Sequence, residues 1–468
     1  MRYINLENMF LFKRYHILAF GLLIFVFALF AYLRYANLDK RIIFNWDQEQ
    51  FANQVYDIIV NRKLTLLGPR VLSDKGFFLA PYFTYLLIPY FLITKLHPSA
   101  FIYFVLSYGL LFFTVSFFIL RKMFGFAFAL FFLLLWSINP LLSSYDIIPW
   151  NPLPIPLGVL TVIYILYRIY QKATPLNLVF LGVTLGFFVN MHFQFIFMIF
   201  FAGIFIFLSR KKVFRVKNFL VILMSFLFMF LPLAFFDIRH DYLNAQLFLN
   251  FFTKGGVEQT GKDIFVWQDV FTYFVDPLIL VKNHLLKWAL YFVVSGFLVY
   301  LTKTKKSFFK NFYASSLVLW ISFPVLFMLY GKRPSEYYFV FLYPLIYLVI
   351  VDTFLNLKLK TILVITALIL FIGNINKFKN NRETNWYGLY YKDKVAQKIA
   401  SVGKGRKFNV SYDIPFIFSG DTGYRYLLKY YEVKETGNWS DPLIEVKIPP
   451  ENADIVVDKI GIKLPKQP

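Results

Sequence analysis

The sequence predicts an all-α polytopic membrane protein, and three observations carry this prediction. Of its 468 residues, 59% are hydrophobic, 22% are aromatic and only 16% are charged, with a mean hydropathy of +0.58. Apolar runs recur along most of the chain, and a helix needs about 20 such residues to cross a bilayer core about 30 Å thick. Short basic or turn-rich stretches separate these runs. This composition excludes a soluble enzyme.

The charge balance fits a membrane environment. Lys and Arg total 49 against 26 for Asp and Glu, which gives a formal net charge of +23. In a soluble chain this excess would indicate nucleic-acid binding, but here much of it lies in loops between apolar runs, where anionic lipid headgroups are the expected partners. The chain has no cysteine, so disulfides, thiolate metal sites and cysteine nucleophiles are excluded.

The apolar runs predict about eleven transmembrane helices. They cover residues 17–35, 100–120, 126–142, 153–170, 176–191, 193–209, 218–236, 285–301, 311–330, 338–355 and 360–373. A twelfth run, 77–96, contains Pro81, Pro89 and several tyrosines, and we expect it to lie as a helix along the outer interface. The basic clusters then face the cytoplasm, as the positive-inside rule requires. This topology puts the N-terminus inside and the C-terminus outside.

This topology divides the chain into two domains. We expect a transmembrane domain at 1–373, which includes a first outer loop at 36–99 with the interfacial helix, and an extracytoplasmic domain at 374–468. The tail alternates helical and strand patterns: helices at 390–402 and 423–431, and strands at 408–412, 443–448 and 455–457. A small α/β domain follows. No internal repeat is visible across the spans, which disfavours an inverted-repeat transporter.

The sharpest group of polar residues follows the first predicted span. Asp47 and Glu49 lie two residues apart on a segment that carries both apolar and polar side chains. An ordinary solvated loop would explain them. The functional interpretation is a general base at the outer membrane surface, because a carboxylate held at a helix end can take the proton of an attacking hydroxyl. The second carboxylate would then tune the first or hold a cation.

Further polar residues lie at the predicted outer ends of later spans. Asp146 follows one span, and a helix cap in a Pro-rich turn is its alternative explanation. His192 lies between two apolar runs, where packing is the alternative. Arg239, Lys332 and Arg333 are suited to a lipid phosphate or pyrophosphate, with ordinary headgroup contact as the alternative.

In chain order, these groups resemble motifs of the C-superfamily of polyprenyl-phosphate-dependent glycosyltransferases, in the branch of protein O-mannosyltransferases and the lipid A aminoarabinose transferase. The likeness covers most of residues 10–355. The motifs that carry it are Asp47-Gln48-Glu49, Gly68-Pro69, Ala80-Pro81-Tyr82, Trp150-Asn151-Pro152, His192-Phe193, Phe236-Asp237-Ile238-Arg239-His240 and Tyr337-Tyr338-Phe339. Two features depart from the family pattern. Relatives often carry Lys or His where this chain has Leu79, which leaves Lys75 as the nearest base, and Gln48 splits the acidic pair.

The resemblance implies an inverting transfer of a sugar from a polyprenyl-phosphate donor to a glycan, lipid or protein acceptor, outside the cytoplasmic (inner) membrane. Asp47 aligns better than Glu49 with the family's base, and Glu49 would assist catalysis by positioning hydroxyls. The other implied roles are substrate binding by Tyr82, Asp146, Asn151, His192, Tyr337 and Tyr338, and lipid-phosphate binding by Lys75, Arg239, His240, Lys332 and Arg333. No cofactor is required, and participation of a divalent cation stays open.

Two alternatives remain. One is a lipid or polysaccharide flippase or transporter without transferase activity, and the other is a family member that only binds glycans. Acidic residues are nearly absent from the predicted spans, apart from Asp352, which disfavours an ion-coupled transporter. Neither alternative needs Asp47, so replacing that residue separates them from a transferase.

Overall fold

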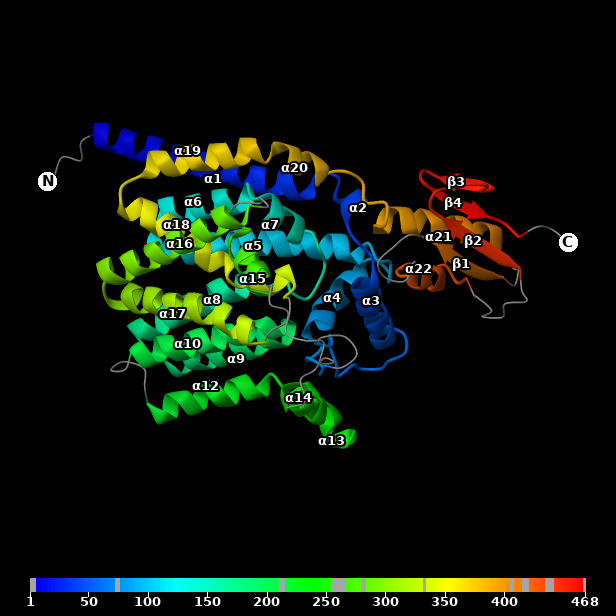
Figure 1. The fold of residues 1–468 in the computed structure, drawn as a ribbon, viewed down its shortest axis with the longest axis horizontal. Helices are drawn as coiled ribbons and strands as arrows, with labels where there is room; N and C mark the ends of the chain where they lie inside the picture. Colours follow the sequence, from blue (N-terminus) through cyan, green and yellow to red (C-terminus); the bar gives the residue numbers. More distant parts are fainter. Residues whose placement is uncertain are drawn as a thin grey trace.

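The computed structural model describes residues 6–71, 76–209, 215–253, 266–278, 283–330, 334–403, 408–414, 421–433 and 442–465. A bundle of apolar helices forms most of the chain, and a small α/β domain lies at one end of it (Figure 1). Helix α1 starts at the opposite end of the bundle.

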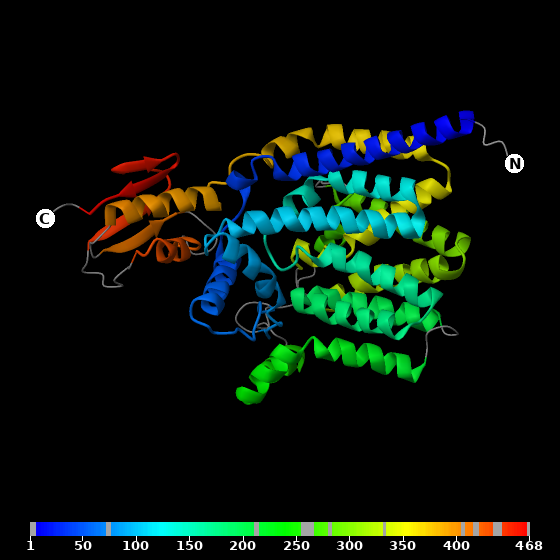
Figure 2. The same cartoon turned by 180° about the vertical axis from the view of Figure 1, so that it is seen from behind.

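The long helices of the bundle run roughly side by side (Figures 1 and 2). Their bounds are α1 (Leu6–Tyr35), α5 (Ala100–Phe124), α6 (Phe126–Ser137), α8 (Ile155–Gln171), α9 (Pro175–Met191), α10 (Ile196–Leu208), α12 (Val216–Phe228), α16 (His284–Thr304), α17 (Ser307–Tyr330), α18 (Tyr343–Asn356) and α19 (Lys360–Gly373). The remaining bundle elements are α15 (Val266–Val275) and the 3₁₀ turns η2 (Phe193–Phe195) and η3 (Glu336–Phe339). Buried side chains between the helices form one continuous apolar core.

The predicted spans coincide with described helices or helix pairs, and the mostly helical membrane fold is confirmed. In the described chain, four helices are long and apolar enough to cross a membrane: Ile17–Tyr35, Ala100–Phe124, His284–Thr304 and Ser307–Met328. The predicted span at 218–236 is broken, because α12 and α13 (Leu231–Arg239) meet at a bend of 58°. Several other apolar helices have 10–17 residues. The number of eleven spans therefore stays a prediction.

Short helices gather at the end of the bundle that faces the α/β domain (Figure 1). They are α2 (Leu38–Arg41), α3 (Trp46–Ile59), α4 (Tyr82–Ile93), α7 (Pro140–Tyr145), α13, α14 (Leu243–Thr253) and α20 (Ile375–Asn380). Helix α4 occupies the predicted interfacial run at 77–96. Its 12 residues span about 18 Å at 1.5 Å per residue, which is too short to cross a bilayer.

A short antiparallel pair of extended segments precedes α4. The N–H of Gly68 donates to the carbonyl of Leu79 (2.7 Å), the N–H of Leu79 donates to Pro69 (3.0 Å), and the N–H of Val71 donates to Phe77 (2.8 Å). We call residues 68–71 and 77–80, which belong to the predicted first outer loop, the outer hairpin. The backbones approach so closely at Gly68 that a Cβ there would collide with the carbonyl of Ala80.

Replacing Gly68 with alanine is expected to destabilise the outer hairpin. The added methyl must push the two backbones apart, and overpacking of this kind costs about 1–3 kcal/mol. The midpoint of thermal unfolding of the purified protein should fall. A Gly21→Ala variant is the matched control, because nothing lies near a Cβ added at Gly21. Equal midpoints for the two variants would show that the close approach at Gly68 is unimportant.

The C-terminal domain combines two helices with a four-stranded sheet. The helices are α21 (Leu389–Gly403) and α22 (Tyr424–Tyr430), and the strands are β1 (Asn409–Asp413), β2 (Leu443–Lys447), β3 (Ile455–Val457) and β4 (Ile460–Lys463). The strand order is β1-β2-β4-β3, with β1 parallel to β2 and the other pairs antiparallel. The prediction missed β4, which follows β3 after only two residues, Asp458 and Lys459. The predicted domain boundaries stay a prediction.

Candidate functional site

The site is built outward from the start of helix α3, which carries both candidate carboxylates. Asn45 precedes the helix in an extended conformation, and its N–H donates to the side chain of Gln48 (3.1 Å), which fixes the first turn. Asp47 and Glu49 are two residues apart, or about 200° around a helix, and therefore point to nearly opposite sides. The two carboxylates thus have different surroundings.

Glu49 faces the C-terminal domain. It is buried, with 8% of its surface exposed, and its two oxygens accept the N–H groups of Gly423 (2.9 Å) and Tyr426 (2.8 Å) at the start of α22. Burial raises the pKa of the Glu49 carboxyl, and the two N–H donors and Lys392 oppose this rise. With both oxygens engaged, Glu49 holds the C-terminal domain, and its predicted catalytic role would act through that contact.

Asp47 is the accessible member of the pair. Its side chain is exposed, and no hydrogen bond or ion pair engages its carboxyl within the described part of the chain. Many protein atoms nevertheless surround the group, and this desolvation raises the pKa of Asp47 above its usual value near 3.8. A carboxylate that solvent reaches and that no described side chain engages is free to contact a ligand.

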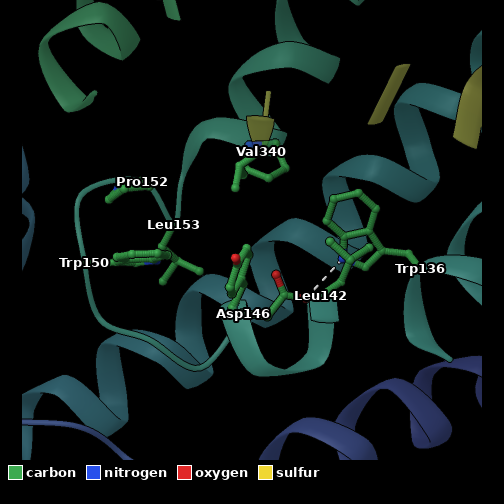
Figure 3. Close-up of a pocket in the computed structure, with 9 residues that line it drawn as sticks. Trp136, Leu142, Asp146, Trp150, Pro152, Leu153 and Val340 are labelled. Carbon is green, nitrogen blue, oxygen red and sulfur yellow. Dashed lines mark hydrogen bonds between the residues drawn. The ribbon is translucent and has the colours of Figure 1, made fainter. Parts of the chain in front are cut away.

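Gln48 joins the start of α3 to the turn after α7. Its side-chain nitrogen donates to the carbonyl of Pro149 (3.3 Å). This turn borders a small pocket, in which the carboxyl of Asp146 lies between the rings of Trp136 and Trp150 (Figure 3). The pocket is lined by Trp136, Leu142, Tyr145, Asp146, Trp150, Pro152, Leu153, Pro156 and Val340.

Asp146 lies in a buried ion pair with Arg34, which the sequence analysis did not single out. Arg34 Nε donates to Oδ2 of Asp146 (2.7 Å), and its two terminal nitrogens donate to the carbonyls of Ser137 and Trp136 (3.0 Å each). Trp136 Nε1 also donates to Oδ2 of Asp146 (3.1 Å). Among the described residues nothing bonds to Oδ1, so that oxygen stays available on the pocket side.

An aromatic cluster extends from the pocket to the start of η2. The ring of Trp150 contacts Tyr337 (centroids 5.2 Å apart), and His192 contacts Tyr337 (5.7 Å) and Tyr338 (5.9 Å). Asn151 donates to the carbonyl of Met191 (2.6 Å), which ties the cluster to the end of α9. Although His192 is partly accessible, the surrounding protein desolvates its ring and lowers its pKa to about 3, so it is neutral at neutral pH. The structure thus brings together four predicted binding residues: Asn151, His192, Tyr337 and Tyr338.

Tyr82 lies at the start of α4, beside the outer hairpin. Its hydroxyl donates to the carbonyl of Met229 (2.7 Å), at the bend between α12 and α13. Asn190 of α9 accepts the N–H of Ala80 (2.9 Å) and so fixes the residue before the Pro81-Tyr82 pair. These contacts give Tyr82 and Asn190 a role in shaping the predicted first outer loop.

The segment with Arg239 and His240 contacts the outer hairpin through its neighbours. Asp237 accepts the N–H of Asn244 (2.7 Å), and the Asn244 side chain bonds both the N–H and the carbonyl of Phe78 (2.7 and 3.2 Å). Arg239 and His240 themselves are exposed, and the His240 ring stacks on Phe236. In the described contacts, neither joins the aromatic cluster. The predicted phosphate ligands Lys75, Lys332 and Arg333 lie outside the described residues.

Several residues that organise the site were missed by sequence reasoning. They are Arg34, Asn244 and Lys392. Arg34 offered a usable signal, because it is a cation at the outer end of a predicted span, where basic residues are disfavoured. Asn244 offered none, since its role depends on the backbone of Phe78, 166 residues earlier.

No family model and no curated protein matches the chain, whereas solved structures do. The crystal structure of ArnT from Cupriavidus metallidurans bound to undecaprenyl phosphate matches with a TM-score of 0.59 and 13% sequence identity, over 94% of this chain and 97% of that chain. The apo structure of the same ArnT gives a TM-score of 0.60 and 14% identity, over 95% and 98%. This chain has the ArnT fold.

The ArnT fold confirms the resemblance drawn from the sequence motifs. The match extends over nearly the whole length of both chains, so it includes the helical bundle and the C-terminal domain alike. At this level of identity the likeness is one of fold, and the chemistry has to be argued from the residues of this chain. Among the described residues, no group of three or more His, Asp or Glu side chains is arranged to hold a metal ion.

Proposed function

We propose that this protein is an integral membrane glycosyltransferase. In this proposal it transfers a sugar from a polyprenyl-phosphate donor to an acceptor on the outer face of the cytoplasmic membrane, with inversion at the anomeric carbon. The observation that carries the proposal is Asp47, an exposed carboxylate without a partner in the described chain, in a protein with the ArnT fold. The next residue, Gln48, bonds Pro149 at the border of the aromatic pocket. No cofactor is part of the proposal.

Asp47 would act as the general base. It would take the proton of the acceptor hydroxyl as the oxygen attacks the anomeric carbon, and the bond from that carbon to the lipid phosphate would break. Attack from the face opposite the leaving phosphate inverts the anomeric configuration. The raised pKa of Asp47 supports this role, because a stronger base takes a proton more readily.

The pocket would hold the sugar. Oδ1 of Asp146 can accept a sugar hydroxyl while Oδ2 stays bound to Arg34, and the rings of Tyr145 and Trp150 offer faces on which a pyranose or furanose ring can stack. Asn151, His192, Tyr337 and Tyr338 line the adjoining side. A neutral His192 suits hydrogen bonding to an uncharged hydroxyl.

The donor phosphate would be bound by cations of the outer loops. ArnT was crystallised with undecaprenyl phosphate, which supports a polyprenyl-phosphate donor here. The candidates in this chain are Arg239 and His240, which are exposed, and Lys75, Lys332 and Arg333. A guanidinium group can bind two phosphate oxygens at once and stabilise the charge that develops as the phosphate leaves.

The proposal is tested with purified protein in nanodiscs. The protein is incubated with a panel of radiolabelled polyprenyl-phosphate sugars and a membrane extract as acceptor. Transfer of label from one donor would establish the transferase and identify the sugar. If no donor binds to the wild-type protein, the phosphate site is wrong and the flippase or transporter becomes the better interpretation.

The transferase should show a pH dependence on its acid side. A base works only when deprotonated, so turnover should rise as pH rises through the pKa of Asp47, at a pH above the usual carboxyl value near 3.8. The measurement is kcat against pH with the identified donor at saturation. If the acid side of the kcat–pH profile has its midpoint at or below the usual carboxyl pKa near 3.8, the role of Asp47 is contradicted.

A coupled transporter finds less support in the membrane part of the chain. Asp352, the acidic residue noted within a predicted span, accepts the hydroxyl of Tyr313 (2.6 Å) and the ammonium of Lys305 (2.9 Å). Its two oxygens are thus engaged within the protein. An ion-coupled transporter needs a carboxylate that can bind and release its ion.

A further inference from the structure

The C-terminal domain docks on the segment that leads into α3. Helix α21 packs against α2. Two backbone hydrogen bonds join the segments at the end of α2 and the start of α21, from the N–H of Asn385 to the carbonyl of Lys40 (2.9 Å) and from the N–H of Leu389 to the carbonyl of Ile42 (3.0 Å). These bonds link residues more than 340 positions apart. The C-terminal domain thus contacts and supports the predicted first outer loop.

Lys392 of α21 is the centre of this contact. Only 4% of its surface is exposed, and its Nζ donates to the carbonyl of Phe44 (2.8 Å), to Oδ1 of Asn45 (2.9 Å) and to the carbonyl of Thr422 (2.7 Å). Burial lowers the pKa of Lys392 to about 7, and Glu49 and Asp421 oppose this shift. Three acceptors fit the ammonium form, which has three N–H groups. Lys392 therefore fixes the two residues directly before α3.

Glu49 completes the contact from the other side of Asp47. As described above, its oxygens accept the N–H groups of Gly423 and Tyr426 at the start of α22. The first turn of α3 is thus held at residues 44–45 by Lys392 and at Glu49 by α22. Asp47 lies between these two attachments in the sequence, and helical geometry turns its side chain about 200° from that of Glu49.

We propose that Lys392 and Glu49 are positioning residues, through which the C-terminal domain sets the orientation of Asp47. This inference rests on the proposed function of Asp47 as a base. A base must be held within about 0.5 Å and 10–20° of its productive geometry, which one attachment at a helix end does not ensure. The two attachments fix both the direction and the rotation of the first turn.

The chemistry of the contact indicates that it positions the start of α3 rather than stabilising the protein. Removing an ammonium and a carboxylate from water is costly. Apolar residues of similar volume in their place often stabilise a protein equally well or better. Directional bonds to backbone carbonyls and N–H groups define a position instead. We expect the contact to matter for turnover more than for donor binding, because the donor-binding candidates lie on other elements.

The test compares Lys392→Met with Lys394→Met in the full-length protein in nanodiscs. Lys394 lies on the same helix, but its side chain is exposed and contacts the ring of Tyr390, so its replacement is the matched control. In Lys392→Met, hydrogen exchange of the amides of residues 46–50 should become faster. kcat should fall about 10- to 100-fold, since a misplacement of about 1 Å costs up to 100-fold, while the Kd for undecaprenyl phosphate stays near that of the wild type.

The pH profile adds a readout that mere destabilisation would not change. A looser first turn admits water to Asp47, so the acid limb of kcat should move to lower pH in Lys392→Met. Glu49→Gln keeps the side-chain shape and should give the same pattern with a smaller amplitude. If Lys392→Met does not accumulate as folded protein, Glu49→Gln alone tests whether the contact positions Asp47.

Three results would overturn the inference. One is unchanged exchange at residues 46–50, a second is faster exchange with unchanged kcat, and a third is loss of donor binding in proportion to kcat. Failure of the proposed function looks different. In that case the wild-type protein transfers no label from any donor, whereas the exchange measurement still reports whether Lys392 holds the start of α3.

Discussion

Replacing Asp47 with asparagine is expected to abolish most of the transfer activity. Asparagine keeps the size of the side chain and can still hydrogen-bond, but it cannot take a proton from the acceptor hydroxyl. General-base catalysis contributes about 100- to 10,000-fold to a rate, and kcat should fall by that factor. Because Asp47 bonds no other described residue, the substitution leaves no partner unsatisfied and the fold should be kept.

The measurement is transfer of label with saturating donor, together with binding of undecaprenyl phosphate. Binding should change little, since the proposed phosphate ligands are cations elsewhere in the predicted outer loops. Asp57→Asn is the matched control, because Asp57 lies on the same helix and bonds Asn61 at the opposite end from Asp47. If Asp47→Asn and Asp57→Asn transfer label at equal rates, Asp47 is not the base and a transporter or a glycan-binding protein gains support.

The helices were predictable because hydropathy alone defines them. Buried and lipid-facing residues are both apolar, so each span is a long apolar run whatever it packs against. The number of crossings was harder to derive. At the bend between α12 and α13, one apolar run continues through a break of 58° that hydropathy does not register. Strand β4 was missed for a different reason, since it has only four residues and one of them is Gly461.

The site was predictable where it depends on local sequence and unpredictable where it depends on long-range contacts. Asp47 and Glu49 stood out as a pair, and helical geometry alone would have placed them on opposite faces once α3 was recognised as a helix. The partners of Glu49 could not be predicted, because they are 374 and 377 residues away in the sequence. The same holds for Asp146, whose capping explanation gave no hint of Arg34, 112 residues earlier.

Replacing Arg34 with methionine is expected to have the largest effect on stability. Arg34 is fully buried, and its guanidinium group bonds Asp146 and the carbonyls of Ser137 and Trp136. The substitution leaves a buried carboxylate without its counter-ion, which costs about 3–5 kcal/mol when one partner of a buried pair is removed. Denaturant titration in detergent micelles, followed by helical circular dichroism, should show a correspondingly lower midpoint.

The double variant Arg34→Met/Asp146→Leu separates two contributions to this loss of stability. One is the unpaired carboxylate of Asp146, and the other is the loss of the bonds from Arg34 to the carbonyls of Ser137 and Trp136. The double variant removes both charges, so it should recover a large part of the stability if the unpaired carboxylate is the main cost. Lys40→Met, which removes an exposed cation from the same end of the bundle, should stay within about 0.5 kcal/mol of the wild type. Equal losses for the single and double variants would mean that Arg34 stabilises the protein through the carbonyls of Ser137 and Trp136. Asp146 would then owe its position to Trp136, and the pocket would form without the ion pair.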